Sequence, residues 1–261
     1  MKIAVVGKGG SGKTTLAGTL ARVLAKRNQR ILAIDGDPNP NLALTLGVSR
    51  VRAEGIRNIP ANLVETEQSP EGAYRLRLIR TKEDVIGEFG TAAPDGIKLI
   101  VMGKPPDGSA GSGCMCASHR AVRGLITELS GSQDHTVTDM EAGLEHLKRG
   151  TARNVEAMLV VVEPYYRSLE AGSRTFSLAR ELGIPHLYAV SNKVRDDADR
   201  SAIEAYCAQH KMALIGEVPF EADFEKAERT EQAPFDYAPD SAGVRAVEKI
   251  ADRLAALAPT T

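Results

Sequence analysis

The sequence lacks tryptophan altogether, contains only three cysteines, and has no apolar run near the ~20 residues that a membrane-spanning helix needs. Its N-terminal stretch MKIAVVGKGG turns to glycine too early for the apolar part of a signal peptide. A small, odd number of cysteines argues against a disulfide framework and for a reducing compartment. The formal net charge is -1, which gives no overall attraction to nucleic acid or anionic lipid. We therefore expect a cytoplasmic protein that binds neither nucleic acid nor membranes.

What the sequence does contain is enough for one sizeable core: 261 residues, of which 43% are hydrophobic. Short apolar runs of strand length recur, and most are continuous rather than alternating, as in strands buried on both faces of a parallel sheet. These runs are Ile3–Val6, Ile31–Ile34, Leu76–Ile79, Ile97–Met102, Met158–Val162, Leu187–Val190 and Met212–Ile215. Helical patterns lie between several of them. Residues 1–261 are therefore predicted to form one α/β domain, with a doubly wound, mostly parallel sheet and helices on both faces.

Two other segments need separate interpretation. Residues 47–96 mix charges without a clear period, which indicates a surface excursion or a short insert. The C-terminal segment 241–261 carries an apolar stripe at helical spacing, made of Val244, Val247, Ile250, Leu254 and Leu257. Because its polar face mixes both charge signs, we expect this helix to pack on the domain and not on a membrane.

The octapeptide GKGGSGKT, residues 7–14, fits the pattern G-x-x-x-x-G-K-[ST] and lies between the strand-like KIAVV and a helical stretch. In such a loop, successive backbone N–H groups turn toward phosphate oxygens, and the helix N-terminus adds partial positive charge. Lys13 would neutralise the β- and γ-phosphates of a nucleotide, and the Thr14 hydroxyl would bind Mg²⁺. The predicted phosphate-binding residues are Gly9, Gly10, Ser11, Gly12, Lys13, Thr14 and Thr15.

Two further features narrow the class of nucleotide-binding protein. Lys8 directly follows the first glycine of the loop, and this second lysine marks the deviant Walker A motif. The stretch ILAIDGDPNPN puts Asp35 and Asp37 at the end of the second expected strand, where loops face the nucleotide. On these residues the chain resembles the MinD/ParA-type ATPases, which include the nitrogenase iron protein and the arsenite-pump ATPase.

This resemblance implies a P-loop NTPase fold and the hydrolysis of ATP to ADP and phosphate. By the same resemblance, Asp37 would orient or activate the attacking water, and Asp35 would lie near the Mg²⁺ waters. Lys8 would reach across a dimer interface to the nucleotide of the other subunit, adding charge where phosphate charge develops. The catalytic residues expected on this basis are Lys8, Lys13 and Asp37.

Two later segments complete the expected nucleotide site. HTVTDMEAGLEHLKRG, residues 135–150, is interpreted as a strand ending at Asp139, followed by a mobile loop that senses the γ-phosphate. Asp139 would hold Mg²⁺ through water. The strand LYAV continues into SNKV, so Asn192 matches the family's base-binding asparagine, whose amide both donates to and accepts from adenine. Without the other motifs, Asn192 would be a turn residue. The VPF at 218–220 is expected to close the base pocket.

The stretch GSGCMCASHR, residues 111–120, places Cys114 and Cys116 between an expected strand and an apolar-periodic helix. Together with DMEAGLEHL, it resembles the accessory ATPases of carbon monoxide dehydrogenase maturation, the CooC type, which serve nickel insertion. One chain offers two adjacent thiols, whereas a soft divalent metal such as Zn²⁺ prefers four ligands, so a two-fold dimer would supply four thiolates. The alternatives are a redox pair and a pair without function. We interpret His119 as a solvent-facing helix residue and Cys207 as a core residue.

The resulting hypothesis is an ATP-dependent metallochaperone ATPase that uses ATP/ADP, Mg²⁺ and Ni²⁺ or Zn²⁺. It would form a homodimer that depends on ATP and metal, with carbon monoxide dehydrogenase or another metalloenzyme as its client. Two alternatives stay open: a ParA/MinD-like partitioning or positioning ATPase, and an iron–sulfur electron carrier resembling the nitrogenase iron protein. The first of these needs a basic surface for DNA or a basic amphipathic helix for membranes, and neither stands out in the sequence.

Overall fold

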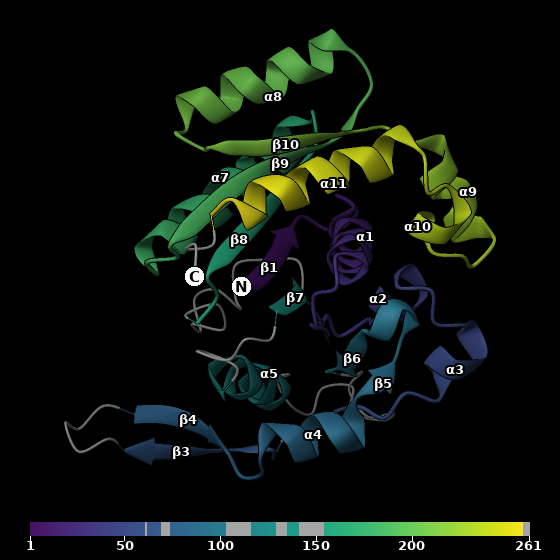
Figure 1. The fold of residues 1–261 in the computed structure, drawn as a ribbon. Coiled ribbons are helices and arrows are strands. Elements are labelled where there is room, and N and C mark those ends of the chain that lie inside the picture. The colour runs from purple at the N-terminus through teal and green to yellow at the C-terminus, as the bar shows by residue number, and fades with distance from the viewer. Residues whose placement is uncertain (61, 69–73, 103–115, 129–134, 141–153, 258–261) are drawn as a thin grey trace, which may run out of the picture.

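A computed structural model describes residues 1–60, 62–68, 74–102, 116–128, 135–140 and 154–257 (Figure 1). Within these residues, the main sheet has eight strands in the order β10-β9-β8-β1-β7-β2-β6-β5. Its neighbouring strands are parallel except for β5, which is antiparallel to β6. In the order of the chain, they are β1 (Lys2–Gly7), β2 (Ile31–Gly36), β5 (Thr91–Ala92), β6 (Lys98–Val101), β7 (His135–Met140), β8 (Ala157–Val162), β9 (His186–Val194) and β10 (Leu214–Pro219).

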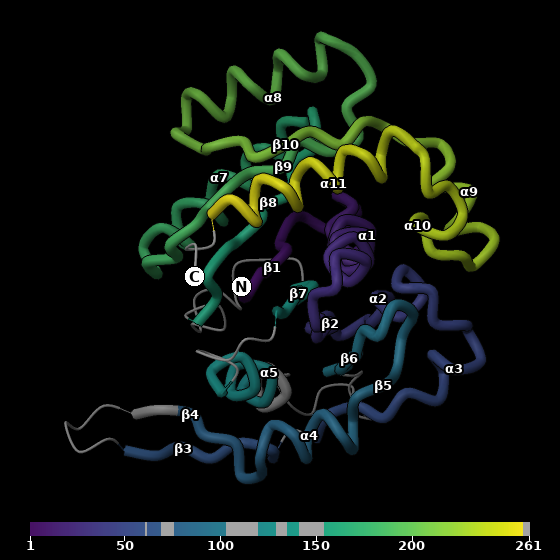
Figure 2. Tube along the Cα trace, viewed as in Figure 1, coloured from purple at the N-terminus to yellow at the C-terminus, as the bar shows by residue number. Residues whose placement is uncertain are grey.

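Helices cover both faces of this sheet, which confirms the predicted doubly wound α/β fold (Figure 2). One buried apolar cluster joins the sheet to α1, α2 and α11, and a second cluster joins the opposite face to α4, α5, α7 and α8. The described helices are α1 (Lys13–Lys26), α2 (Leu42–Thr45), α3 (Arg50–Glu54), α4 (Lys82–Phe89), α5 (Cys116–Glu128), α7 (Tyr166–Glu181), α8 (Asp197–Gln209), α9 (Ala222–Arg229), α10 (Pro234–Tyr237) and α11 (Ala242–Ala255), with a 3-10 turn at Pro94–Gly96.

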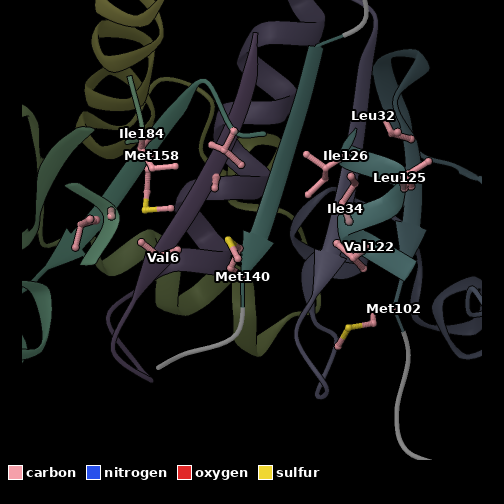
Figure 3. Packing of buried hydrophobic residues seen from close by; sticks show 14 of the residues in the cluster. Val6, Leu32, Ile34, Met102, Val122, Leu125, Ile126, Met140, Met158 and Ile184 are labelled. Carbon is pink, nitrogen blue, oxygen red and sulfur yellow. The ribbon is translucent and has the colours of Figure 1, made fainter. Parts of the chain in front are cut away.

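The central strands explain why continuous apolar runs predict a parallel sheet. Every residue of β1 and of β8 is buried, because helices lie against both faces. Successive side chains point to opposite faces, so Val5 joins the cluster around α1 and Val6 joins the cluster around α5. Figure 3 shows part of the second cluster, in which Val6 of β1 lies beside Met140 of β7, and Val122 and Ile126 of α5 lie beside Ile34 of β2.

The C-terminal stripe forms α11, which packs on the domain as predicted. Ser241 caps this helix, because its side-chain oxygen accepts a hydrogen bond from the N–H of Val244 at 3.2 Å. Val247, Ile250 and Leu254 belong to the apolar cluster around α1, and Val244 is buried as well. Over the residues that the structure describes, none of the helices combines the length and the apolar character needed to cross a membrane.

The segment 47–96 contains more regular structure than its sequence pattern indicates. It forms α3, α4, β5 and a two-stranded antiparallel ribbon of β3 (Val64–Gln68) and β4 (Tyr74–Leu78), which lies beside α5 (Figure 1). The run Leu76–Ile79 is mostly strand, but the prediction of a place in the parallel sheet is wrong for it. Its sequence alternates leucine with arginine, so Leu78 is buried while Arg77 on the other face is exposed.

Candidate functional site

The glycine-rich loop connects β1 to α1 at the carboxyl edge of the sheet. Gly10 and Gly12 have left-handed backbones, with φ of 82° and 89°, which only glycine adopts readily. At Gly12 the space is closed as well, because a Cβ there would lie 2.3 Å from the side-chain nitrogen of Asn192. α1 begins at Lys13, so the unpaired N–H groups of its first turn lie at the end of this loop.

A cleft of about 480 Å³ opens at the loop. Lys13, Thr14 and Thr15 line it at the helix N-terminus, and Asp37 lines it from the end of β2. Helix α9 contributes Glu228 and Phe224, and Gly10 and Gly12 contribute from the loop itself. Lys8 and Gly9 are exposed. A cleft at a helix N-terminus that is lined by a lysine suits the phosphates of a nucleotide.

Lys13 and Asp37, both predicted to be catalytic, are in direct contact. The ammonium of Lys13 donates to Oδ2 of Asp37 at 3.1 Å. Oδ1 of the same carboxylate accepts a hydrogen bond from the backbone N–H of Asn39 at 2.9 Å, which fixes the turn that follows β2. Lys13 is buried and Asp37 is partly exposed to the cleft. The structure therefore brings the phosphate-loop lysine and the predicted water-orienting carboxylate to the same point.

Asp35 and Asp139 lie side by side at the ends of adjacent strands, because β2 and β7 pair in the register Asp35↔Asp139. Asp35 accepts hydrogen bonds from the backbone N–H groups of Leu42 at 2.9 Å and Asp37 at 3.2 Å. Asp139 accepts one from the Thr14 hydroxyl at 2.6 Å. Burial raises the pKa of the Asp139 carboxyl to about 7 and that of Asp35 to about 6, because both are removed from water.

These groups fit a bound Mg²⁺. The second oxygen of Asp139, Oδ1, is buried without a hydrogen-bond partner, and the Thr14 hydroxyl lies next to the same carboxylate. Among the described residues, no group of three or more His, Cys, Asp or Glu side chains is arranged to hold a metal by itself. The oxygen atoms of Thr14 and Asp139 suit Mg²⁺, which takes oxygen ligands, keeps several waters and relies on nucleotide phosphates for the rest of its shell.

Asn192 lines a second, smaller cavity that adjoins the phosphate cleft at Gly12 and Thr15. Val218, Pro219 and Phe220, predicted to close the base pocket, line the same cavity. The amide nitrogen of Asn192 donates to the backbone carbonyl of Ser11 at 2.7 Å. Its amide oxygen is thus the group that an adenine amino group would meet. Recognition of adenine by Asn192 stays a prediction.

Lys193 and Glu163 belong to this site and are absent from the sequence-based prediction. The ammonium of Lys193 donates to the backbone carbonyl of Gly10 at 2.6 Å and pairs with the Glu163 carboxylate at 2.9 Å. Glu163 directly follows β8, and Lys193 is the residue after Asn192. The sequence signal for Lys193 is its place in SNKV. For Glu163 the signal is weaker, namely a carboxylate at a strand end.

The predicted metal pair falls at the border of what the structure describes. Cys114 lies outside the described residues, as does the segment 141–150 that was predicted to sense the γ-phosphate. Cys116 is the first residue of α5. This helix is anchored on the β3–β4 ribbon, because Arg120 donates to the Thr66 hydroxyl at 2.7 Å. Gly124 leaves space for close packing there, since a Cβ at this residue would lie 2.3 Å from Cγ1 of Val64.

Comparison with known sequences identifies relatives over most of the chain. Residues 2–235 match the family described as the CobQ/CobB/MinD/ParA nucleotide binding domain. The carbon monoxide dehydrogenase accessory protein CooC of Rhodospirillum rubrum is 36% identical over 244 residues, which cover 92% of this chain and 91% of that protein. An uncharacterised ATP-binding protein of Methanocaldococcus jannaschii is 38% identical over 224 residues, which cover 84% of this chain and 85% of that protein.

Solved structures show the same fold. The cell division ATPase MinD of Pyrococcus furiosus aligns with a TM-score of 0.70 at 22% identity, over 98% of this chain and 99% of that chain. MinD of Pyrococcus horikoshii, solved as a complex with Mg-ADP, aligns with a TM-score of 0.70 at 20% identity, over 99% of this chain and 97% of that chain. The family match, the similarity to CooC and this shared P-loop NTPase fold confirm the resemblance seen in the phosphate loop: the chain belongs to the CobQ/CobB/MinD/ParA family of nucleotide-binding proteins.

Proposed function

We propose that the protein is an ATP-hydrolysing metallochaperone that assists nickel insertion into carbon monoxide dehydrogenase or a related metalloenzyme. The observation that carries this proposal is the similarity to CooC, which extends over 92% of the chain. The nucleotide part is supported by the cleft at the phosphate loop, where Lys13, Thr14 and Asp37 line one wall. A cytoplasmic location and a single domain over residues 1–261 stay predictions.

In the proposed reaction, the ammonium of Lys13 contacts Asp37 before ATP binds and the phosphates of ATP afterwards. Without nucleotide, its ammonium contacts Asp37 at 3.1 Å. The phosphates of ATP offer more negative charge at the same place, so Lys13 would turn to them and leave the Asp37 carboxylate to orient the attacking water. Mg²⁺ would be held by Thr14 and, through water, by Asp35 and Asp139. When bound, it neutralises charge on the phosphates.

The proposed cargo site combines Cys114 and Cys116 of two subunits. Four thiolates suit Ni²⁺ or Zn²⁺ as the metal that is carried, and two-fold symmetry brings the two pairs together. The same homodimer would close around the nucleotide, with each Lys8 reaching toward the site of the other subunit. Lys8 is exposed, as such a reach requires.

Metal content measured by mass spectrometry after anaerobic purification tests this function. The Cys114→Ser/Cys116→Ser double variant should lose stoichiometric nickel or zinc yet keep ATP binding, because the two sites lie on separate loops. A matched control is Cys207→Ala. Cys207 is buried on α8, and burial raises the pKa of its thiol to about 11, so this residue should not bind metal. Equal metal content in the double variant and the wild type would contradict the cargo site.

The fold similarity to MinD supports a partitioning or positioning ATPase as the second candidate. ATP-dependent binding to non-specific DNA or to anionic lipid vesicles would favour it, and we expect neither. An iron–sulfur carrier would be brown after anaerobic purification because of its cluster, whereas we expect no iron–sulfur absorption. Co-purification with carbon monoxide dehydrogenase, in the presence and absence of ATP, then tests the client.

A further inference from the structure

Lys193 lies in an unusual backbone position within β9. Its φ is 57°, in the left-handed region. The register with β10 pairs Val218 with Asn192 and Pro219 with Val194, so Lys193 is an extra residue, a bulge in a parallel pair of strands. A bulge of this kind redirects one side chain and is common next to functional sites.

Such a position favours glycine. A lysine with positive φ is strained, because its Cβ is crowded by the backbone, and glycine has no such crowding. Lys211 offers a comparison within the same chain. It has a φ of 54° where α8 ends, and it is exposed on the surface. Strained residues persist where surrounding structure holds them, and they gather at functional sites.

The side chain of Lys193 connects the bulge to the phosphate loop and to the end of β8. Its ammonium donates to the Gly10 carbonyl at 2.6 Å, and Glu163 holds the same ammonium at 2.9 Å from the end of β8. The preceding residue, Asn192, donates to the Ser11 carbonyl at 2.7 Å. Two consecutive residues of β9 therefore hold two consecutive carbonyl groups of the phosphate loop.

We propose that Lys193 is a positioning residue for the nucleotide. By holding the Gly10 carbonyl, it keeps a partial negative charge directed at β9 and away from the phosphates. It does this from the cleft wall, since Lys193 lines both the phosphate cleft and the base cavity. The strain at the bulge is therefore retained for nucleotide binding and not for the stability of the sheet. This inference rests on the nucleotide part of the proposed function and not on the metal part.

A substitution that relieves the strain at residue 193 separates a role in nucleotide binding from a role in the stability of the sheet. Lys193→Gly fits the left-handed backbone, and this relief of strain should offset the loss of the ion pair with Glu163. The protein without nucleotide should therefore unfold near the wild-type temperature. Its Kd for Mg-ADP should nevertheless increase by about tenfold or more, as expected for the loss of a hydrogen bond from a charged donor. Lys193→Arg keeps a cation that can reach a carbonyl, and it should restore most of the affinity. Lys211→Gly relieves similar strain away from the site and should leave the Kd unchanged.

Isothermal titration with Mg-ADP and thermal unfolding of the same four proteins test this inference. A Lys193→Gly protein that binds Mg-ADP as tightly as the wild type would overturn it, and so would one that unfolds well below the wild type, because the lysine would then be needed for the sheet. Failure of Lys193→Arg to restore affinity would also overturn it. A wild-type protein that does not bind Mg-ADP would overturn the proposed function itself.

Discussion

The ammonium of Lys13 and the carboxylate of Asp37 lie 3.1 Å apart, although the two residues come from the start of α1 and the loop after β2. This contact joins the phosphate-binding lysine to the residue proposed to orient water. A nucleotide that takes Lys13 therefore also changes the environment of Asp37. Substitutions of Lys13 and of Asp37 should therefore affect ATP binding and ATP hydrolysis separately.

Lys13→Ala should abolish productive ATP binding. It removes the cation that the phosphates would contact, and it leaves Asp37 as an uncompensated negative charge in the cleft. Titration with ATP and ADP measures the loss. Lys26→Ala is a matched control, because Lys26 ends the same helix and forms an ion pair with Asp95 away from the cleft. Binding by Lys13→Ala within about twofold of the wild type would exclude the assigned role.

Asp37→Asn should leave ATP bound but nearly unhydrolysed. The amide keeps the size of the carboxylate and still accepts a hydrogen bond from Asn39, but it is a poor acceptor for the proton of an attacking water. Phosphate release at saturating ATP measures the effect, and we expect a decrease of roughly a hundredfold or more. If the variant hydrolyses ATP at the wild-type rate, another group must orient the water.

Stability without Mg²⁺ and nucleotide should increase as the pH falls from about 8 to about 5. Burial raises the pKa of Asp139 to about 7 and that of Asp35 to about 6, above the ordinary value of 3.8. At pH values between 3.8 and the raised pKa values, the folded protein holds protons on these two carboxyls that the unfolded chain releases. The stabilisation is therefore present in full below the unfolded pKa and is lost as the pH rises through 6 to 7. Thermal unfolding in a metal chelator measures the slope.

Asp139→Asn supplies the control for this pH dependence, because asparagine does not titrate. We expect the variant to be at least as stable as the wild type at pH values near 8, with a smaller change in stability toward acid. A wild type whose stability is constant over this range would contradict the raised pKa values. Loss of stability in the variant at every pH would instead point to the hydrogen bond from Thr14 as the dominant contribution.

Lys8→Ala should bind ATP, fail to hydrolyse it, and show no ATP-dependent change in dimerisation or metal affinity. If closure of the dimer links the two sites, nucleotide and metal must change each other's affinity by the same factor. Sedimentation and nickel titration, with and without a slowly hydrolysed ATP analogue, measure this coupling. Coupling that is unchanged in Lys8→Ala would mean that the lysine does not transmit it, even if both sites exist.

Most of the nucleotide site can be predicted because its residues occupy short stretches at strand ends. The pairing of Asp35 with Asp139 follows once both strands are parallel neighbours, although they are far apart in sequence. The pair Glu163–Lys193 is harder to predict, because it depends on a bulge that no sequence pattern marks. Helix α9, which lines part of the cleft, carries mostly charged residues and gives no sign that Phe224 and Glu228 face the site.

The errors at strand boundaries have a similar origin. The apolar run that starts at Met212 predicts a strand there, but β10 begins at Leu214. Met212 lies before the strand and is apolar because it is buried in the core cluster that includes α7 and α8. At its other end, β10 continues past the apolar run and includes the polar residue Glu217. The charge of Glu217 is compensated there by an ion pair with Arg200 of α8. Burial and pairing decide these boundaries, and neither is visible in hydrophobicity alone.

Arg22 has consequences for how the chain folds during synthesis. This arginine of α1 is 3% exposed, and its guanidinium donates to both carboxylate oxygens of Asp236, at 2.6 and 2.8 Å, across 214 positions of sequence. Asp95 pairs with the same guanidinium at 2.6 Å, so Arg22 is only partly compensated until Asp236 is made, and a buried, incompletely paired cation is unfavourable. At roughly 5–20 residues per second, a ribosome takes on the order of 10–40 s to make the intervening chain. The side of the core around α1 should therefore stay incomplete, and open to proteases, until the last part of the chain has left the ribosome.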